Sequence, residues 1–362
     1  MSNRRVRVAI VGVGNCCSAL IQGLRFYREK KAEEAHGILH YELGGYTADS
    51  LEVAAAFDVD RRKVGNDLSQ AIFTQPNNYK KIVDIPMMNI PVLMGAVLDG
   101  VNAHLESMIE VASQREVDIV EVLKDHAIEV FINLLPTGAD EASRFYAKAA
   151  LEAGCAFINA TPAPIAGDVS LVHEFEERKL PVIGDDVMSQ IGGTVFHRNI
   201  LEFLAERGVK VDNSYQLDVG GGMETYNTLD PKRRMLKRGI KTSTIRQGLP
   251  YEADIVAGTT DYVGFLENSR TSYYWISGRY YLDTPLQVDI YLRTVDAPNA
   301  AAILIDSARA AKIALDRGVG GPLSTVCHYG YKRPPTHEGE ERVSTVEAHK
   351  RFREFIEGKR NQ

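Results

Sequence analysis

Short apolar, β-branched runs alternate with helical patterns along the first half of the chain. Residues 140–152 carry apolar side chains at helical spacing, and we expect Asp140 to cap this helix and Gly154 to end it. Such alternation predicts a parallel sheet covered by helices. The runs with strand character are Val6–Val11, 53–57, 129–134, Ala156–Asn159 and Pro181–Ile183.

The pattern changes after about residue 210. Residues 272–280 and 286–292 are rich in Tyr, Val and Ile with partial alternation, which is typical of a mixed sheet with one exposed face. Residues 299–316 then return to an Ala-rich apolar helix. We therefore expect an open α/β domain that is interrupted by a smaller mixed domain. The expected bounds are residues 1–198 with 297–362 for the first domain and 199–296 for the second.

Composition and charge place the chain among ordinary globular proteins. Of its 362 residues, 44% are hydrophobic and 25% are charged, and 42 Lys+Arg against 48 Asp+Glu give a net charge of −6. This mild acidity argues against a general nucleic-acid binder, which needs an excess of basic charge. The sequence holds neither a signal-peptide core nor an apolar run of about 20 residues, so we expect no membrane partner.

The cysteines and histidines predict no metal site. The cysteines are Cys16, Cys17, Cys155 and Cys327, and no pair of them has CxxC spacing. The adjacent thiols of Cys16 and Cys17 favour a reducing compartment, so we expect a cytoplasmic protein. His36 and His40 have metal-like spacing, but Gly37 between them disfavours a helix, and we interpret them as loop histidines.

A glycine turn follows the first predicted strand. Gly12 and Gly14 permit a tight turn and a close approach of the backbone to a pyrophosphate, and the next helix offers its unpaired N–H groups. The third glycine of the usual fingerprint is absent, and Cys17 stands in its place. The turn alone is compatible with a dinucleotide site or with a purely structural role.

Asp58 supports the dinucleotide interpretation. It ends the second predicted strand, where an acid can hydrogen-bond the adenosine ribose and disfavours the 2′-phosphate of NADP. Its distance along the chain from Gly14 requires an insertion of about residues 28–50. The sequence therefore predicts NAD as a cofactor, against the alternative that Asp58 only caps a turn.

Segments spread from about residue 6 to residue 335 carry a more specific signal. They are VGVGNC at 11–16, AAFDVD at 55–60, KVG at 63–65, LDG at 98–100, LPTG at 135–138, GDD at 184–186, SQ at 189–190, ID at 305–306, AAKIA at 310–314 and KRPP at 332–335. In this order they resemble the myo-inositol-1-phosphate synthase family, particularly its shorter actinobacterial-type members.

The resemblance implies a Rossmann-type parallel-sheet domain interrupted by a smaller α+β domain for catalysis and oligomerisation. It also implies a homotetramer and an NAD that is used without net consumption. The implied reaction oxidises a hexose 6-phosphate, enolises it, closes a ring by an intramolecular aldol step and reduces the product again. Such a site needs cations for the phosphate and the successive oxyanions.

The family motifs carry over to particular residues. The implied catalytic residues are Lys237, Lys241, Lys332, Arg270, Asp261 and Glu224. The implied cofactor-binding residues are Gly12, Gly14, Asn15, Cys16, Asp58, Thr137, Gly138, Asp185, Asp186, Ser189 and Asp296. Without the resemblance, the basic run that holds Lys237 and Lys241 predicts a solvated face or an RNA patch, Lys332 is a loop lysine, and one of Asp185 and Asp186 caps a helix.

Departures from the family leave the substrate open. Met188 and Arg270 stand where the family has lysines, Gly222 replaces an Asn, and Glu224 replaces an Asp. Arg cannot exchange a proton near neutral pH, whereas a buried Lys can. Two substrates remain: glucose 6-phosphate, giving inositol phosphate, or fructose 6-phosphate, giving a smaller-ring cyclitol phosphate for a carbocyclic natural product. The other function classes are a simple NAD-linked sugar-phosphate dehydrogenase and a non-catalytic NAD or sugar-phosphate binding protein.

Overall fold

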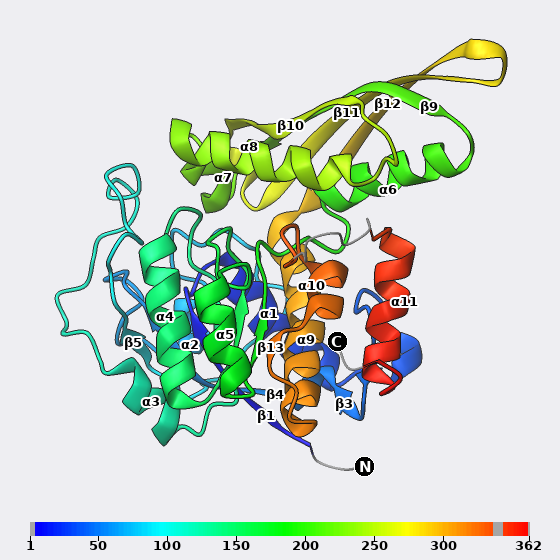
Figure 1. Cartoon of the computed structure of the whole chain (residues 1–362). Coiled ribbons are helices and arrows are strands. Elements are labelled where there is room, and N and C mark those ends of the chain that lie inside the picture. The colour runs from blue at the N-terminus through cyan, green and yellow to red at the C-terminus, as the bar shows by residue number, and fades with distance from the viewer. Residues whose placement is uncertain (1–3, 336–342, 361–362) are drawn as a thin grey trace.

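The computed structural model describes residues 4–335 and 343–360 and contains two main sheets (Figure 1). The larger sheet is seven-stranded and parallel, in the order β13-β8-β7-β6-β1-β4-β5. Its strands are β1 (Val6–Val11), β4 (Leu51–Asp58), β5 (Val92–Met94), β6 (Val130–Asn133), β7 (Ala156–Asn159), β8 (Pro181–Ile183) and β13 (Gly321–Pro322). The predicted α/β class is confirmed, and each predicted strand is present with bounds within a few residues.

Helices cover both faces of the parallel sheet. Alternate strand residues point to opposite sides, and they are apolar on both sides, so each face packs against helices. Ile10 and Ile158 pack towards α1 (Asn15–Arg28) and α9 (Asp296–Asp316), while Val11 and Phe157 pack towards the opposite helices. Those opposite helices are α3 (Ile119–Asp125), α4 (Asp140–Ala153) and α5 (Val169–Glu177). Beside α9 lie α10 (Ser324–Gly330) and α11 (Thr345–Ile356) (Figure 1).

The start of α4 corrects one sequence prediction. Asp140 is the first helical residue and does not cap the helix. The capping acceptor is instead the carboxylate of Asp99, which accepts hydrogen bonds from the backbone N–H groups of Glu141 at 2.8 Å and Ala142 at 2.9 Å. Gly154 ends the helix as predicted, in a left-handed conformation with φ 81°.

The second sheet is four-stranded, in the order β10-β9-β11-β12. Its strands are β9 (Lys210–Gly220), β10 (Asp254–Tyr262), β11 (Ser269–Tyr280) and β12 (Thr284–Val295). The helices α6 (Gly193–Glu206) and α8 (Pro231–Arg246) cover one face through a cluster that includes Leu201, Ile245 and Ile276. The hairpin of β11 and β12 extends beyond the body of the molecule (Figure 1).

The remaining elements are short. They are η1 (Ala32–Glu34), β2 (Glu42–Leu43), β3 (Tyr46–Thr47), η2 (Ala48–Ser50), α2 (Leu68–Ala71), α7 (Met223–Asn227), η3 (Gly264–Leu266) and η4 (Tyr281–Asp283). Several of them fill the insertion between α1 and β4 that the sequence predicted. None of the described helices is long and apolar enough to cross a membrane.

Candidate active site

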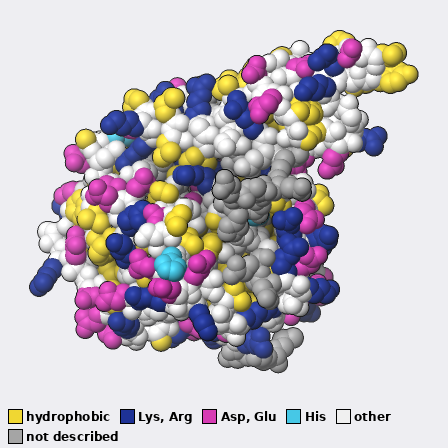
Figure 2. All heavy atoms as spheres, viewed as in Figure 1, with side chains coloured by type: hydrophobic (Ala, Val, Ile, Leu, Met, Phe, Trp, Pro, Cys, Tyr) yellow, Lys and Arg dark blue, Asp and Glu magenta, His cyan; other side chains and the backbone are white. Residues whose placement is uncertain are grey.

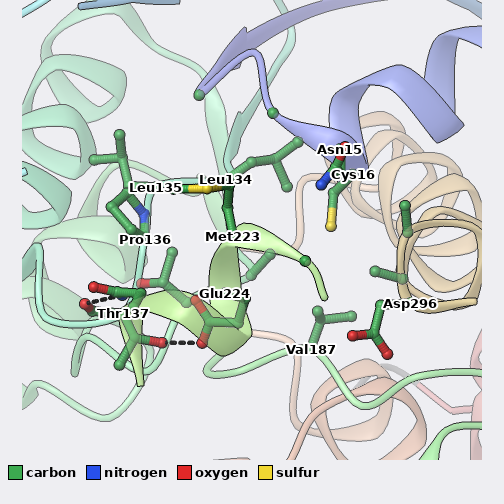
Figure 3. Close-up of a pocket in the computed structure, with 18 of the residues that line it drawn as sticks. Asn15, Cys16, Leu134, Leu135, Pro136, Thr137, Val187, Met223, Glu224 and Asp296 are labelled. Atoms are coloured by element: carbon green, nitrogen blue, oxygen red, sulfur yellow. Dashed lines mark hydrogen bonds between the residues drawn. The ribbon is translucent and has the colours of Figure 1, made fainter. Parts of the chain in front are cut away.

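A cavity of about 330 Å³ lies between the carboxyl edge of the parallel sheet and the helices of the second sheet, which is a usual place and size for a ligand site in such folds (Figure 3). The predicted residues that line it are Gly12, Gly14, Asn15, Cys16, Asp58, Thr137, Asp186, Ser189, Glu224, Lys237, Lys241, Arg270, Asp296 and Lys332. The fold thus gathers residues from the regions of both main sheets at one place.

The glycine turn forms one wall of this cavity. Gly12 has φ +92°, and a Cβ on it would lie 2.7 Å from the carbonyl oxygen of Leu134, so both its conformation and its contacts require glycine. A Cβ on Gly14 would meet no atom within 4 Å. In the described structure α1 begins after Gly14 with no side-chain cap and no acidic residue in its first turn. Its first N–H groups are therefore available to an anion.

Asp58 ties the end of β4 to this turn. Its Oδ2 accepts a hydrogen bond from the Val13 N–H at 2.7 Å, and its Oδ1 accepts from the N–H groups of Val59 at 2.7 Å and Asp60 at 2.9 Å. Asp58 also lines the cavity, and a carboxylate has about four acceptor sites, so capacity remains for ligand hydroxyls. The open Gly14, the uncapped α1 and the placement of Asp58 together fit a dinucleotide.

Lys63 contacts the glycine turn, and it is not among the site residues predicted from the sequence. Its buried Nζ donates to the carbonyl oxygen of Val13 at 2.8 Å and to Oδ1 of Asn77 at 3.1 Å. The signal that could have identified it is its place in the KVG segment shared with the family.

Asp186 holds two of the predicted lysines on the other side of the cavity. Its carboxylate lies 2.7 Å from Nζ of Lys332 and 3.2 Å from Nζ of Lys237, and Glu224 lies 3.1 Å from Lys237. Thr137 donates its hydroxyl to Glu224. Figure 3 shows the contact with Thr137, and together with the Lys237 contact it makes Glu224 a link between the loop after β6 and α8.

The two lysines that share Asp186 differ in acidity. Burial is the main influence on Lys332 and lowers its pKa to about 8, although Asp186 opposes the shift. Burial acts in the same direction on Lys237, but Asp186 and Glu224 outweigh it and raise the pKa of Lys237 above its usual value. Lys332 can therefore exchange a proton near neutral pH, whereas Lys237 stays charged.

Arg270 and Asp296 form a second ionic contact in the cavity. Nε and Nη2 of Arg270 donate to the Asp296 carboxylate at 2.8 and 2.7 Å, in the forked geometry that a lysine cannot reproduce. Nη1 of Arg270 is buried and has no hydrogen-bond partner among the described residues.

Asp218 is a cavity residue that sequence reasoning missed. Its buried carboxylate lies 2.6 Å from Nζ of Lys241 and 3.7 Å from Nη1 of Arg270. The sequence around Asp218 carries no signal for this position, because the burial of its side chain is known only from the structure.

Gly138, Asp185 and Asp261, which were predicted for the site, do not line the cavity. Gly138 has φ +87° and packs against the guanidinium of Arg233. Asp261 is exposed, and its carboxylate accepts a hydrogen bond from the N–H of Tyr262.

Asp185 points away from the cavity into the loop before α5. Its carboxylate accepts hydrogen bonds from the N–H groups of Ile165 and Ala166, both at 3.0 Å, and from the Asn159 amide at 2.7 Å. Burial raises its pKa to about 6. Asp185 therefore shapes the loop, and Asp186 alone of this pair lines the cavity.

The basic run of α8 does not form one solvated face. Lys237 and Lys241 line the cavity, and Arg233 is buried against Asn227. On the face shown in Figure 2, basic and acidic side chains are interspersed. Within the described residues no group of three or more His, Cys, Asp or Glu could hold a metal ion, and His40 pairs with Asp306 at 2.7 Å.

The family model described as myo-inositol-1-phosphate synthase matches residues 192–297. The chain is 40% identical to the inositol-3-phosphate synthase of Mycolicibacterium smegmatis over 98% of both chains. It is 41% identical to the inositol-3-phosphate synthase of Corynebacterium glutamicum over 92% of this chain and 95% of that protein.

Solved structures are similar over nearly the full length. The structure of Ari2 is 32% identical with a TM-score of 0.79, covering 98% of this chain and 100% of that one. A myo-inositol-1-phosphate synthase-related protein from Thermotoga maritima has a TM-score of 0.82 at 24% identity, covering 98% of this chain and 99% of that one. The second likeness concerns the fold alone.

Proposed function

The chain belongs to the myo-inositol-1-phosphate synthase family, and from this premise we propose that it is an isomerase that cyclises a hexose 6-phosphate with a bound NAD. The observation that carries the proposal is the placement of Lys237, Lys241, Lys332 and Arg270 on the same cavity as the glycine turn. The conversion is redox-neutral, and its product is a phosphorylated cyclitol isomeric with the substrate.

The glycine turn, the start of α1 and Asp58 are the proposed NAD site. NAD bound there would supply a hydride acceptor for the first oxidation and a hydride donor for the last reduction. Gly14 gives the pyrophosphate room, and the α1 N–H groups offer it hydrogen bonds. The carboxylate of Asp58 would accept from the ribose hydroxyls and repel a 2′-phosphate.

The cations of the cavity are the proposed sugar-phosphate site. Lys332 has the acidity needed to take a proton from the carbon next to the new ketone and to return one later. Lys237, Lys241 and Arg270 would hold the phosphate and the developing oxyanions in a water-poor space, where such charges act most strongly. Arg270 would act as a fixed charge because guanidinium keeps its proton.

Incubation of purified protein with glucose 6-phosphate or fructose 6-phosphate and substoichiometric NAD tests this proposal. Phosphorus NMR and mass spectrometry should detect a product with the mass of the substrate and a new phosphorus signal from one of the two sugars. Conversion of all the added NAD to NADH, with an equal amount of oxidised sugar phosphate and no isomer, would support the dehydrogenase alternative. No product from either sugar would leave the binding-protein alternative.

We also propose that the region from α6 to β12, which includes the expected domain of residues 199–296, carries catalysis and oligomerisation. The face of its sheet that α6 and α8 leave uncovered bears Tyr215 stacked on Trp275 with ring centroids 5.5 Å apart, and Tyr291 is 74% exposed. Hydrophobic side chains also gather at the hairpin tip, where Leu282 is 82% exposed (Figure 2). Such surface favours a homotetramer, and a monomer in light scattering would contradict it.

A further inference from the structure

A line of buried polar side chains runs along β9 to the cavity. Ser214, Gln216 and Asp218 occupy alternate positions of this strand, and each is at most 3% exposed. Apolar residues such as Val211 and Ile276 fill much of the same layer between sheet and helices. Polar groups buried among apolar ones need a specific explanation, since each requires a partner to offset its desolvation.

The direction of the hydrogen bonds is fixed at the cavity end of this line. Because the Asp218 carboxylate only accepts, the Gln216 amide nitrogen faces it, at 2.8 and 3.0 Å from its two oxygens. The Gln216 oxygen then faces Nδ1 of His197 at 3.2 Å. Burial lowers the pKa of His197 to about 4, so its ring is neutral and donates from Nδ1. Ser214 Oγ lies 2.7 Å from the other ring nitrogen and 2.9 Å from the carbonyl oxygen of Trp275, and its single proton serves one of these two acceptors.

At the cavity end, Asp218 contacts both cations of this side. Lys241 and Arg270 surround its carboxylate, and Ser272 donates its hydroxyl at 2.6 Å. Burial opposes ionisation, but the two cations lower the pKa of Asp218 to about 2, so it is charged throughout the working range. The packing is tight here, because a Cβ on Gly193 would lie 2.4 Å from Nε2 of Gln216.

We propose that Asp218 is a positioning residue for the cyclisation. Held by Gln216 and Ser272, it keeps the Lys241 ammonium and the Arg270 guanidinium in fixed places, with Nη1 of Arg270 left to donate to an oxygen of the sugar phosphate. A buried ion pair contributes little net stability by itself, whereas preorganised cations act on oxyanions as they develop. This inference rests on the proposed function.

Asp218→Asn tests the inference, with Asp306→Asn as the matched control. Asp306 is equally buried and pairs with Arg309 and His40, but it does not line the cavity. We expect Asp218→Asn to lower kcat roughly 100-fold, while its melting temperature falls no further than that of Asp306→Asn. Asp306→Asn should keep a kcat close to wild type below its melting temperature. Equal losses of kcat in the two variants would overturn the inference, as would a near-native kcat in Asp218→Asn.

A milder variant, Ser272→Ala, tests the inference even if Asp218→Asn does not fold. Ser272→Ala removes one hydrogen bond to Asp218 and leaves every charge in place, so kcat should fall roughly fivefold with the NAD content unchanged. An unaltered kcat in Ser272→Ala contradicts the positioning role.

Failure of the proposed function can be distinguished from failure of the positioning role of Asp218. If the wild-type protein forms no cyclitol phosphate, calorimetric titration with each hexose phosphate replaces kcat as the readout. If Asp218→Asn then binds the hexose phosphate more weakly than Asp306→Asn does, the positioning role is supported. Equal binding by the two variants contradicts it.

Discussion

The two halves of the cavity are built from different parts of the chain. The half proposed for the cofactor presents backbone, through the glycine turn and the start of α1. The half proposed for the sugar phosphate presents side-chain charge, through lysines held by Asp186 and Asp218. Added side-chain volume disturbs the first half and lost charge disturbs the second. Single substitutions should therefore separate cofactor binding from turnover.

The largest difference between the effect on turnover and the effect on cofactor binding is expected from Lys332→Met. Turnover should fall about 10³-fold because the proposed proton-exchanging group is lost. The NAD content of the purified protein should not change, since Nζ of Lys332 bonds to Asp186 and the Val187 carbonyl and not to the glycine turn. Phosphorus NMR measures the turnover, and Lys81→Met, an exposed position, is the control. A near-native rate would remove Lys332 from the mechanism.

The pH dependence of kcat also tests the difference between the two halves of the cavity. Because burial lowers the pKa of Lys332 to about 8, its neutral form grows with pH up to that value. We expect kcat to rise about tenfold per pH unit below pH 8 and to level off above it. Lys332→Arg should abolish this limb, since Arg keeps its proton. NAD affinity, measured in parallel, should be insensitive to pH over this limb. A wild-type profile without the limb would contradict the assignment.

In the cofactor half, two glycines form a matched pair. Gly14→Ala adds a methyl group that meets no protein atom, so the melting temperature of the cofactor-free protein should be unchanged. Overpacking against the pyrophosphate of about 1–3 kcal/mol should weaken NAD binding about 5- to 150-fold. Gly12→Ala should lower both NAD affinity and stability, because its φ of +92° and the Leu134 contact exclude a side chain. Native NAD affinity in Gly14→Ala would place the cofactor elsewhere.

The smallest effect is expected from Asp58→Asn. Removing one negative charge should raise the affinity for NADP relative to NAD roughly fivefold. Titration of both cofactors measures this ratio, and turnover with saturating NAD should remain. An unchanged ratio would mean that Asp58 serves only the turn, through Val13 and Asp60.

Local patterns predicted the parallel sheet well because its strands are short apolar runs bounded by turns. Ala156–Asn159 and Pro181–Ile183 were placed without error. The family resemblance, carried by ordered segments over nearly the whole chain, is confirmed by relatives at about 40% identity. The glycine turn and two lysines of α8, Lys237 and Lys241, line the cavity.

Long-range contacts explain what the sequence could not predict. The cap of α4 comes from Asp99, 42 residues before Glu141, so no local pattern reveals it. Asp185 and Asp186 are neighbours, yet the backbone turns them to opposite sides and only Asp186 lines the cavity. The role proposed for Asp218 depends on its contacts with Lys241 of α8 and Arg270 of β11, which are distant from it in the sequence.

The position of α9 has a consequence for the synthesis of the protein. This helix is buried along most of its length and covers one face of the parallel sheet, including Val8 of β1 and Ile158 of β7. It leaves the ribosome only after the whole second sheet has been made, because β12 leads directly into it. Until then the first strands expose an apolar face, and the nascent sheet cannot complete its core. Completion of the core of the parallel sheet must therefore wait for the last fifth of the chain.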